Sequence, residues 1–141
     1  MKNNLINGVV GILFATILVS SCDVSSYSNT SNCPVLVGAP TASVSGPTEA
    51  AINEEITLNV TYKTKNNCED FYNFNRESLA NQRIITVNVM YDACACLDTT
   101  VTTEVEPFKF KESEAGLYNL KFKMGDNLYV VHNVAVGNAT N

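Results

Sequence analysis

The sequence is poor in several residue types, and each scarcity excludes a class of protein. It contains no Trp and a single His, so the H-E-x-x-H motif of zinc metalloproteases is absent. Only nine Lys and Arg residues stand against fourteen Asp and Glu residues, which argues against the basic surface that nucleic-acid binding requires. No apolar run reaches the roughly 20 residues that a transmembrane helix needs. We therefore expect no membrane-spanning helix.

The first 21 residues have the organisation of a secretory signal peptide. Lys2 is the only charged residue before Cys22, and the segment 9–19 is almost wholly apolar. Two small serine residues follow this apolar run. A cationic start, a short apolar run and a small-residue end are typical of such signals, although the A-x-A-like cleavage site of ordinary signals is missing. We therefore predict a signal peptide over residues 1–21.

The end of this signal, Val19-Ser20-Ser21-Cys22, resembles the bacterial lipobox. The resemblance implies that a diacylglycerol is attached to the Cys22 sulfur, that the chain is cut before Cys22 and that the new amine is also acylated. Two or more acyl chains hold a protein stably on a bilayer, because each buried methylene contributes about 0.8 kcal/mol. We therefore expect a lipoprotein that is bound to the membrane through Cys22. The alternative is an ordinary secreted protein whose signal stops near a cysteine.

Removal of residues 1–21 from the 141-residue chain leaves 120 residues, which is the size of one domain. Residues 22–33 continue from the lipidated cysteine with polar residues that have little to bury, so we interpret them as a flexible tether. The remaining residues, 34–141, form the domain. Because Lys2 is lost with the signal, eight basic residues face fourteen acidic ones and the net charge is near −6. We expect no nucleic-acid partner.

Residues 34–141 carry the pattern of short β-strands separated by turns. Segments 56–63 and 83–92 alternate apolar and polar side chains with a period of two, which indicates half-buried strands. Further strands are expected within 34–39, 41–46, 71–75, 99–111, 118–124 and 128–136. Segment 76–82 fits either a hairpin or a one-turn helix. About seven short strands in roughly 100 residues predict an all-β, immunoglobulin-like sandwich of two antiparallel sheets.

The same alternation predicts which side chains form the core. Apolar residues at every second position of a strand face the opposite sheet. They are Ile56, Leu58, Val60, Tyr62, Ile85, Val87, Val89, Tyr91, Phe108, Phe110, Tyr118, Leu120, Phe122, Met124, Leu128, Val130, Val134 and Val136. The acidic pairs Glu54-Glu55 and Glu69-Asp70 fall in predicted turns, and we interpret them as solvated surface groups.

Residues 114–118 read Glu-Ala-Gly-Leu-Tyr and resemble the acid-x-Gly-x-Tyr turn before the penultimate strand of immunoglobulin-like sandwiches. The resemblance implies that the Tyr118 hydroxyl bonds back to the backbone at this corner. The chain departs from antibody-type domains, because it has no Trp and no Cys two residues after Tyr118. Over residues 42–137 it is similar to small Gram-negative envelope lipoproteins with a single immunoglobulin-like domain. That resemblance implies a place on the outer membrane, facing the periplasm or the cell surface, and no particular chemistry.

Four cysteines remain besides Cys22, and an even number in an exported chain indicates disulfides. A bond between Cys94 and Cys96 would close a strained and very small ring. Each of these two cysteines therefore pairs with either Cys33 or Cys68, and two pairings stay open. We prefer Cys68–Cys96 together with Cys33–Cys94. Each bond should stabilise the fold by about 2–4 kcal/mol.

Metal binding is the alternative use of these cysteines, and it leads to a different function. Cys94 and Cys96, with Met90 and His132 as further ligands, suit Cu(I) or zinc, which would make the protein an envelope metal-handling protein. However, exported thiols oxidise, and the spacing is not the usual C-x-x-C of zinc sites. We therefore expect disulfides, and neither a bound metal nor any other cofactor.

A short motif next to these cysteines suggests a modification site. Asp98-Thr99-Thr100 resembles the Asp-Thr-small acceptor that is used for O-glycosylation in some Gram-negative envelopes. Thr99 is therefore a candidate glycosylation site.

The sequence contains neither a serine nucleophile elbow nor a phosphate-binding loop, so we do not expect an enzyme. The leading hypothesis is a lipid-anchored binding or structural module of the cell envelope, whose ligand is a protein or a glycan. Contacts would be made by loops 63–68, 93–100 and 125–127, or by strand addition at the proline-marked edge. Exposure of Tyr72 or Tyr129 on a flat face would favour a carbohydrate ligand.

Overall fold

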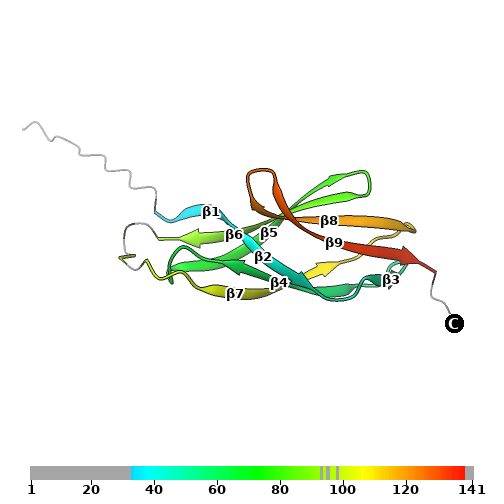
Figure 1. The fold of residues 1–141 in the computed structure, drawn as a ribbon, viewed down its shortest axis with the longest axis horizontal. Helices are drawn as coiled ribbons and strands as arrows, with labels where there is room; N and C mark the ends of the chain where they lie inside the picture. Colours follow the sequence, from blue (N-terminus) through cyan, green and yellow to red (C-terminus); the bar gives the residue numbers. More distant parts are fainter. Residues whose placement is uncertain (1–32, 93, 95, 98, 139–141) are drawn as a thin grey trace, which may run out of the picture. The chain divides into compact units, whose positions relative to one another are not determined.

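The computed structural model describes residues 33–138, with the exception of residues 93, 95 and 98. The predicted signal peptide, Cys22 and nearly all of the tether lie outside the described residues. Within the described part, the chain is all β, with nine strands and no helix (Figure 1). The strands are β1 (Val35–Ala39), β2 (Thr41–Ser45), β3 (Glu49–Ala51), β4 (Ile56–Lys63), β5 (Glu69–Leu79), β6 (Gln82–Tyr91), β7 (Thr103–Phe110), β8 (Gly116–Gly125) and β9 (Leu128–Gly137). A search of the described residues for a helix that is long and apolar enough to cross a bilayer finds none.

The strands form two sheets, and the predicted immunoglobulin-like two-sheet sandwich is confirmed. One sheet has the order β1-β6-β8-β9-β3, and its sixth strand, β5, also pairs with β6 but lies off this path. The second sheet has the order β2-β4-β7. The structure has nine strands where about seven were expected, and two pairs, β3–β9 and β6–β8, are parallel. The β6–β8 pair is parallel because the chain leaves β6, crosses to the smaller sheet as β7 and returns as β8.

The N-terminal part of the domain is one edge segment that changes sheets twice. β1 pairs with β6 in the larger sheet, β2 pairs with β4 in the smaller sheet, and β3 returns to pair with β9. Pro40 separates β1 from β2, and Gly46-Pro47 separates β2 from β3. Proline cannot donate a ladder hydrogen bond, so these positions interrupt pairing where the chain has to cross.

The core lies between the two sheets and follows the predicted period of two. Buried residues alternate along β4, β6, β7, β8 and the second half of β9 and include Leu58, Val60, Ile85, Val87, Val89, Phe110, Leu120, Phe122 and Val134. The prediction was wrong for Met124 and Leu128, which are 43% and 62% exposed. The β8–β9 register shifts between Lys123 and Gly125. This irregularity at the tip of the hairpin breaks the alternation that the sequence predicts.

A row of aromatic rings connects the two sheets through the core. Tyr62 of β4 packs against Phe71 of β5, with ring centroids 6.3 Å apart. The row continues through Phe74 and Phe108 to Phe122, with centroid distances of 5.0, 5.1 and 5.4 Å. The last two contacts are edge-on, and edge-on aromatic pairs contribute about 0.5–1.5 kcal/mol each beyond the area that they bury. The row therefore fixes how β5, an edge strand, lies on the smaller sheet.

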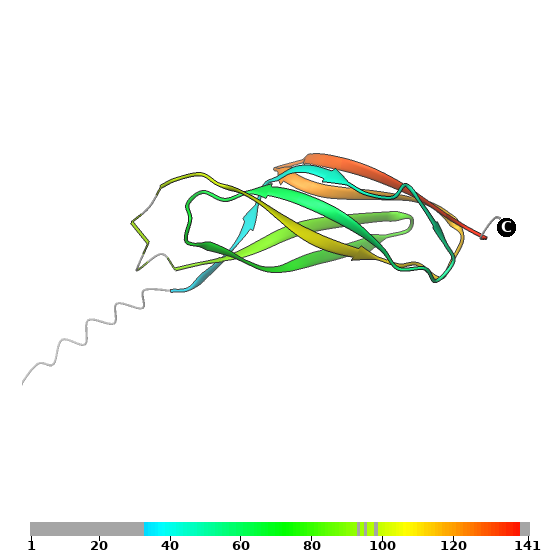
Figure 2. The same cartoon turned by 90° about the horizontal axis from the view of Figure 1, so that it is seen from below.

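Segment 76–82, for which the sequence left two structures open, is part of a β-hairpin. β5 and β6 pair from Glu69↔Tyr91 to Leu79↔Gln82 and are joined by Ala80 and Asn81 (Figure 2). Ala80 has a φ of 49°, a left-handed conformation that is uncommon for a residue with a Cβ. The hairpin places Arg83 next to the turn, where its guanidinium can reach backbone carbonyls.

Gly46 should be sensitive to substitution, because its backbone has a φ of 149° and its surroundings are full. A Cβ at this position would lie 2.7 Å from Leu58 Cδ2 and 3.0 Å from the Thr57 carbonyl oxygen. We expect Gly46→Ala to lower the free energy of unfolding by more than about 1 kcal/mol, as measured by urea denaturation. Gly137→Ala is the matched control, because a Cβ there has no neighbour within 4 Å. Equal stability of the two variants would contradict this account of the sheet crossing.

Candidate functional site

Two disulfides close one end of the sandwich. They join Cys33 to Cys94 and Cys68 to Cys96, with a Cα–Cα distance of 6.0 Å in each case. These are the pairs that the sequence analysis prefers. Cys33 lies just before β1 and Cys68 just before β5, whereas both partners follow β6. The sequence separations of 61 and 28 residues correspond to about 3–5 kcal/mol of stabilisation per bond in the chain-entropy account.

Hydrogen bonds hold the β4–β5 connection against the segment that precedes β7. The Thr64 amide donates to the Thr102 carbonyl oxygen at 3.1 Å, and the two side-chain hydroxyls lie 2.6 Å apart. The buried Asn66 accepts a hydrogen bond from the Cys68 amide through its Oδ1 at 2.9 Å. Loop 63–68 and the described part of loop 93–100 therefore meet at this end. The third predicted contact loop, 125–127, lies at the tip of the β8–β9 hairpin.

Beside this closed end, a cavity of about 290 Å³ lies between the beginning of β5 and the beginning of β7. We call it the acidic hollow and define it by its lining residues, Tyr62, Asn67, Glu69, Asp70, Phe71, Thr102, Glu104 and Glu106. β5 contributes two of its four carboxylates and β7 the other two. Sequence reasoning missed this site. The spacing of Glu104 and Glu106, which places both on one face of a strand, was the available signal.

Glu69 corrects the interpretation of Glu69-Asp70 as a solvated pair. Asp70 is exposed, but Glu69 is only 7% exposed and lines the acidic hollow. Its Oε2 accepts a hydrogen bond from the Lys65 amide at 2.8 Å, which ties the carboxylate to the preceding turn. The strand begins at Glu69, and the alternation of its side chains leaves Glu69 buried and Asp70 at the exposed edge of the hollow.

Tyr62 lies at the inner wall of the acidic hollow. Its side chain is 1% exposed, and its hydroxyl has no hydrogen-bond partner in the part of the chain that the structure describes. Burial, followed by the charges of Glu106, Glu104, Asp70 and Glu69, raises the pKa of Tyr62 to about 12. The phenol therefore stays protonated at neutral pH. It can donate a hydrogen bond but cannot serve as a base.

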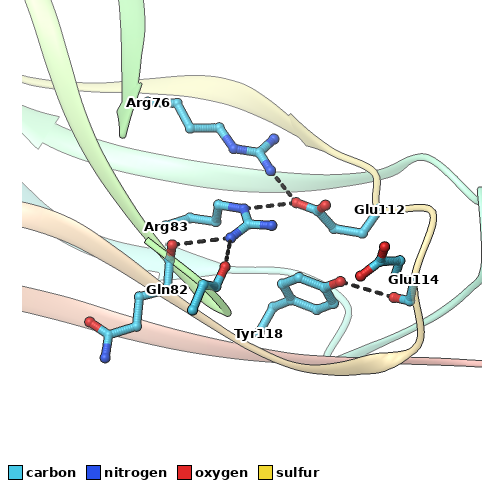
Figure 3. Close-up of polar contacts among 7 residues, drawn as sticks. Arg76, Gln82, Arg83, Glu112, Glu114 and Tyr118 are labelled. Atoms are coloured by element: carbon cyan, nitrogen blue, oxygen red, sulfur yellow. Dashed lines mark hydrogen bonds and ion pairs between the residues drawn. The ribbon is translucent and has the colours of Figure 1, made fainter. Parts of the chain in front are cut away.

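The opposite end of β7 leads into a second polar cluster, whose charged groups are paired with one another and with backbone carbonyls (Figure 3). Glu112 accepts hydrogen bonds from Arg76 and, at 2.9 Å, from Arg83 Nε. The guanidinium of Arg83 also donates to the carbonyl oxygens of Ala80 and Gln82, the latter at 3.1 Å. Arg83 is 8% exposed, and a buried charge requires such partners. We interpret the cluster as structural.

Tyr118 forms the corner that the sequence motif implies. Its hydroxyl donates to the Glu114 carbonyl oxygen at 3.0 Å, and its ring lies 5.0 Å from the Arg83 guanidinium carbon (Figure 3). The ring also packs against Phe110, with centroids 5.7 Å apart. The corner therefore joins the β7–β8 turn to the core.

The cysteines that were considered for metal binding are oxidised in the structure. Among the described residues, Cys33, Asp92 and Cys94 are the only three potential ligands of His, Cys, Asp and Glu type whose atoms all lie within 4.8 Å of one another. Two of these ligand atoms belong to one disulfide, which offers no thiolate. His132 is not in this group, and its Nε2 lies 3.0 Å from the Pro47 carbonyl oxygen. Metal handling would therefore require reduced protein.

The residues considered for glycan chemistry lie at separate places. Thr99 is exposed in the β6–β7 connection. Tyr72 is exposed on β5, whereas Tyr129 is half-buried on β9 and lines a cavity of about 600 Å³ under the β8–β9 hairpin. β6 and β8 separate these two strands, so β5 and β9 are about 14 Å apart across the sheet at the usual strand spacing. The two rings do not form one stacking platform.

Removal of the Tyr118 hydroxyl should weaken the corner. We expect Tyr118→Phe to lower the free energy of unfolding by about 1 kcal/mol, the usual contribution of one hydrogen bond, in chemical denaturation. Tyr72→Phe is the control, because that side chain is exposed and forms no hydrogen bond within the described residues. If Tyr118→Phe were as stable as the control, the hydroxyl contact would have no role in stability.

The raised pKa of Tyr62 predicts a loss of stability at alkaline pH. An unfolded tyrosine ionises near pH 10, whereas Tyr62 in the folded protein holds its proton up to about pH 12. The stabilisation is therefore present below pH 10 and is lost between pH 10 and 12. The free energy of unfolding, measured by chemical denaturation at several pH values across this range, should fall more steeply for the wild type than for Tyr62→Phe. Parallel curves would show that the Tyr62 pKa is close to its ordinary value.

Comparisons with known proteins provide no precedent for this site. No protein-family model, no curated protein and no solved structure matches the chain.

Proposed function

We propose that the protein is a lipid-anchored, non-enzymatic binding module of the bacterial cell envelope. One observation carries this proposal: the four cysteines of the domain are paired with one another, and Cys22 is left as the odd cysteine. An unpaired cysteine in an exported protein requires a separate explanation. Cys22 directly follows the apolar segment and the lipobox-like residues, so acylation of its sulfur provides that explanation.

The disulfides support export, because such bonds form and persist in oxidising compartments. Both close long loops, and neither pair is adjacent in sequence, which is typical of structural disulfides of extracytoplasmic domains. Together with the predicted signal peptide, they favour a location on the outer membrane, facing the periplasm or the cell surface. The lipid provides the membrane contact, and the acidic domain does not adsorb to anionic headgroups.

Binding is a better explanation than catalysis for the polar groups of the described residues. Glu112, Arg76 and Arg83 are joined to one another and to backbone carbonyls, so they are not available for proton transfer. In the acidic hollow, Tyr62 stays protonated at neutral pH and lies among carboxylates, with no nucleophile and base in contact. A rigid scaffold with a charged hollow at its cross-linked end fits recognition of a partner.

The anchor is tested by intact-mass analysis of the protein purified from membranes. We expect the product to begin at Cys22 and to carry the mass of a diacylglycerol and an amide-linked acyl chain, whereas Cys22→Ala carries none. Ser26→Ala, a change within the tether, should keep the full acyl mass. A wild-type product that begins at another residue, or that has no acyl mass, would refute the proposed anchoring.

A further inference from the structure

The acidic hollow contains more negative charge than the fold neutralises. None of its four carboxylates forms an ion pair with a Lys or Arg of the described chain, whereas Glu55 and Glu112 do form such pairs elsewhere. Like charges in one small cavity repel one another, and a cation that enters it removes this repulsion. The hollow is therefore complementary to a positively charged group.

A second observation, independent of the carboxylates, indicates that the hollow receives a ligand. Tyr62 is 99% buried but lines the hollow with a hydroxyl that has no partner among the described residues. Among the described residues, the only fully buried side-chain oxygen without a partner is Thr41 Oγ1, so the Tyr62 hydroxyl is the part of this side chain that reaches the solvent of the hollow. A ligand in the hollow can therefore form a hydrogen bond with this hydroxyl. Glu69, also buried, presents a carboxylate of which only one oxygen has a hydrogen bond within the described residues.

The spacing of the carboxylates distinguishes between two kinds of cation. Ligand oxygens of one Ca²⁺ lie 2.3–2.6 Å from the ion and therefore within about 5 Å of one another. No three acidic oxygens of the hollow meet that condition, because the only three-ligand group in the described chain includes a disulfide. A guanidinium has five N–H donors spread over a planar fork, so it can reach acceptors on opposite walls.

The walls of the hollow also suit a planar, weakly hydrated cation. Phe71, which is half-buried, and Tyr62 line it together and pack against each other. Guanidinium groups stack on aromatic faces and are less strongly hydrated than ammonium groups. The net charge near −6 of the mature chain would also speed the encounter with a basic partner.

We propose that the acidic hollow binds the guanidinium group of an arginine side chain that a partner protein presents. This inference rests on the proposed function, since it names the partner of that binding module. The arginine would donate to carboxylates on β5 and β7, and its plane would lie against the aromatic wall. The hollow is small, so it accepts one side chain, and the neighbouring segments 63–68 and 99–102 would contact the rest of the partner.

The test is a titration of the full lipidated protein in detergent micelles, followed by the amide NMR shifts of the isotopically labelled chain. The ligand is acetyl-Gly-Arg-Gly-amide, and the control ligand replaces arginine with citrulline, which has nearly the same shape and no charge. We expect the arginine peptide, and not the citrulline peptide, to shift amides that line the hollow. Equal shifts with both peptides, shifts elsewhere only, or no shift would overturn the proposal.

Two variants and a calcium titration test whether the binding is specific to the acidic hollow. Glu106→Gln should lower the affinity for the arginine peptide on the order of tenfold, which is the effect of losing one hydrogen bond to a charged group. Glu77→Gln, on the exposed end of β5, should leave this affinity unchanged. Both variants should keep the wild-type unfolding midpoint. Unchanged affinity in Glu106→Gln, or stronger saturation of the same amides by calcium chloride than by the peptide, would overturn the proposal. The lipid mass at Cys22 is measured separately, so a failed titration leaves the anchoring proposal standing, and a missing acyl mass leaves the titration valid.

Discussion

The structure depends on a covalent constraint at one end of the sandwich. Cys94 and Cys96, with one residue between them, are bonded to two different segments, the residues just before β1 and the β4–β5 connection. Two parts of the chain are therefore fixed to the segment after β6. The acidic hollow lies beside this constraint, since one wall is the beginning of β5, which follows Cys68, and the other is the segment from Thr102 to Glu106. Without the Cys68–Cys96 bond, only hydrogen bonds and packing would hold the walls together.

The core provides the rigid support for this end. Alternating apolar residues from both sheets fill the interior, and the aromatic row from Tyr62 to Phe122 crosses from one sheet to the other. Tyr62 belongs both to the core and to the acidic hollow, so the apolar interior and the charged surface meet at one side chain. Because this side chain is packed, its hydroxyl cannot move to find another partner. The position of this hydroxyl in the hollow is therefore fixed by the core.

Local pattern was sufficient to predict most of the fold. Period-two alternation identified the buried faces of β4, β6 and β7, and a five-residue motif predicted the Tyr118 contact. The local pattern failed where contacts between distant segments determine the structure. Met124 and Leu128 became exposed through a register shift, and the parallel β6–β8 pair depends on the path of β7 through the other sheet. The hollow was missed because Tyr62, Glu69 and Glu104 come from three strands that only the sheet packing brings together.

The central claim is that the four domain cysteines form a closed end with one defined pairing. Partial reduction with stepwise alkylation, followed by mass spectrometry of the purified protein, measures that pairing directly. The account predicts the bonds Cys33–Cys94 and Cys68–Cys96, with no free thiol among these residues. The exchanged pairing, Cys33–Cys96 with Cys68–Cys94, or a free thiol at any of the four positions, would contradict it.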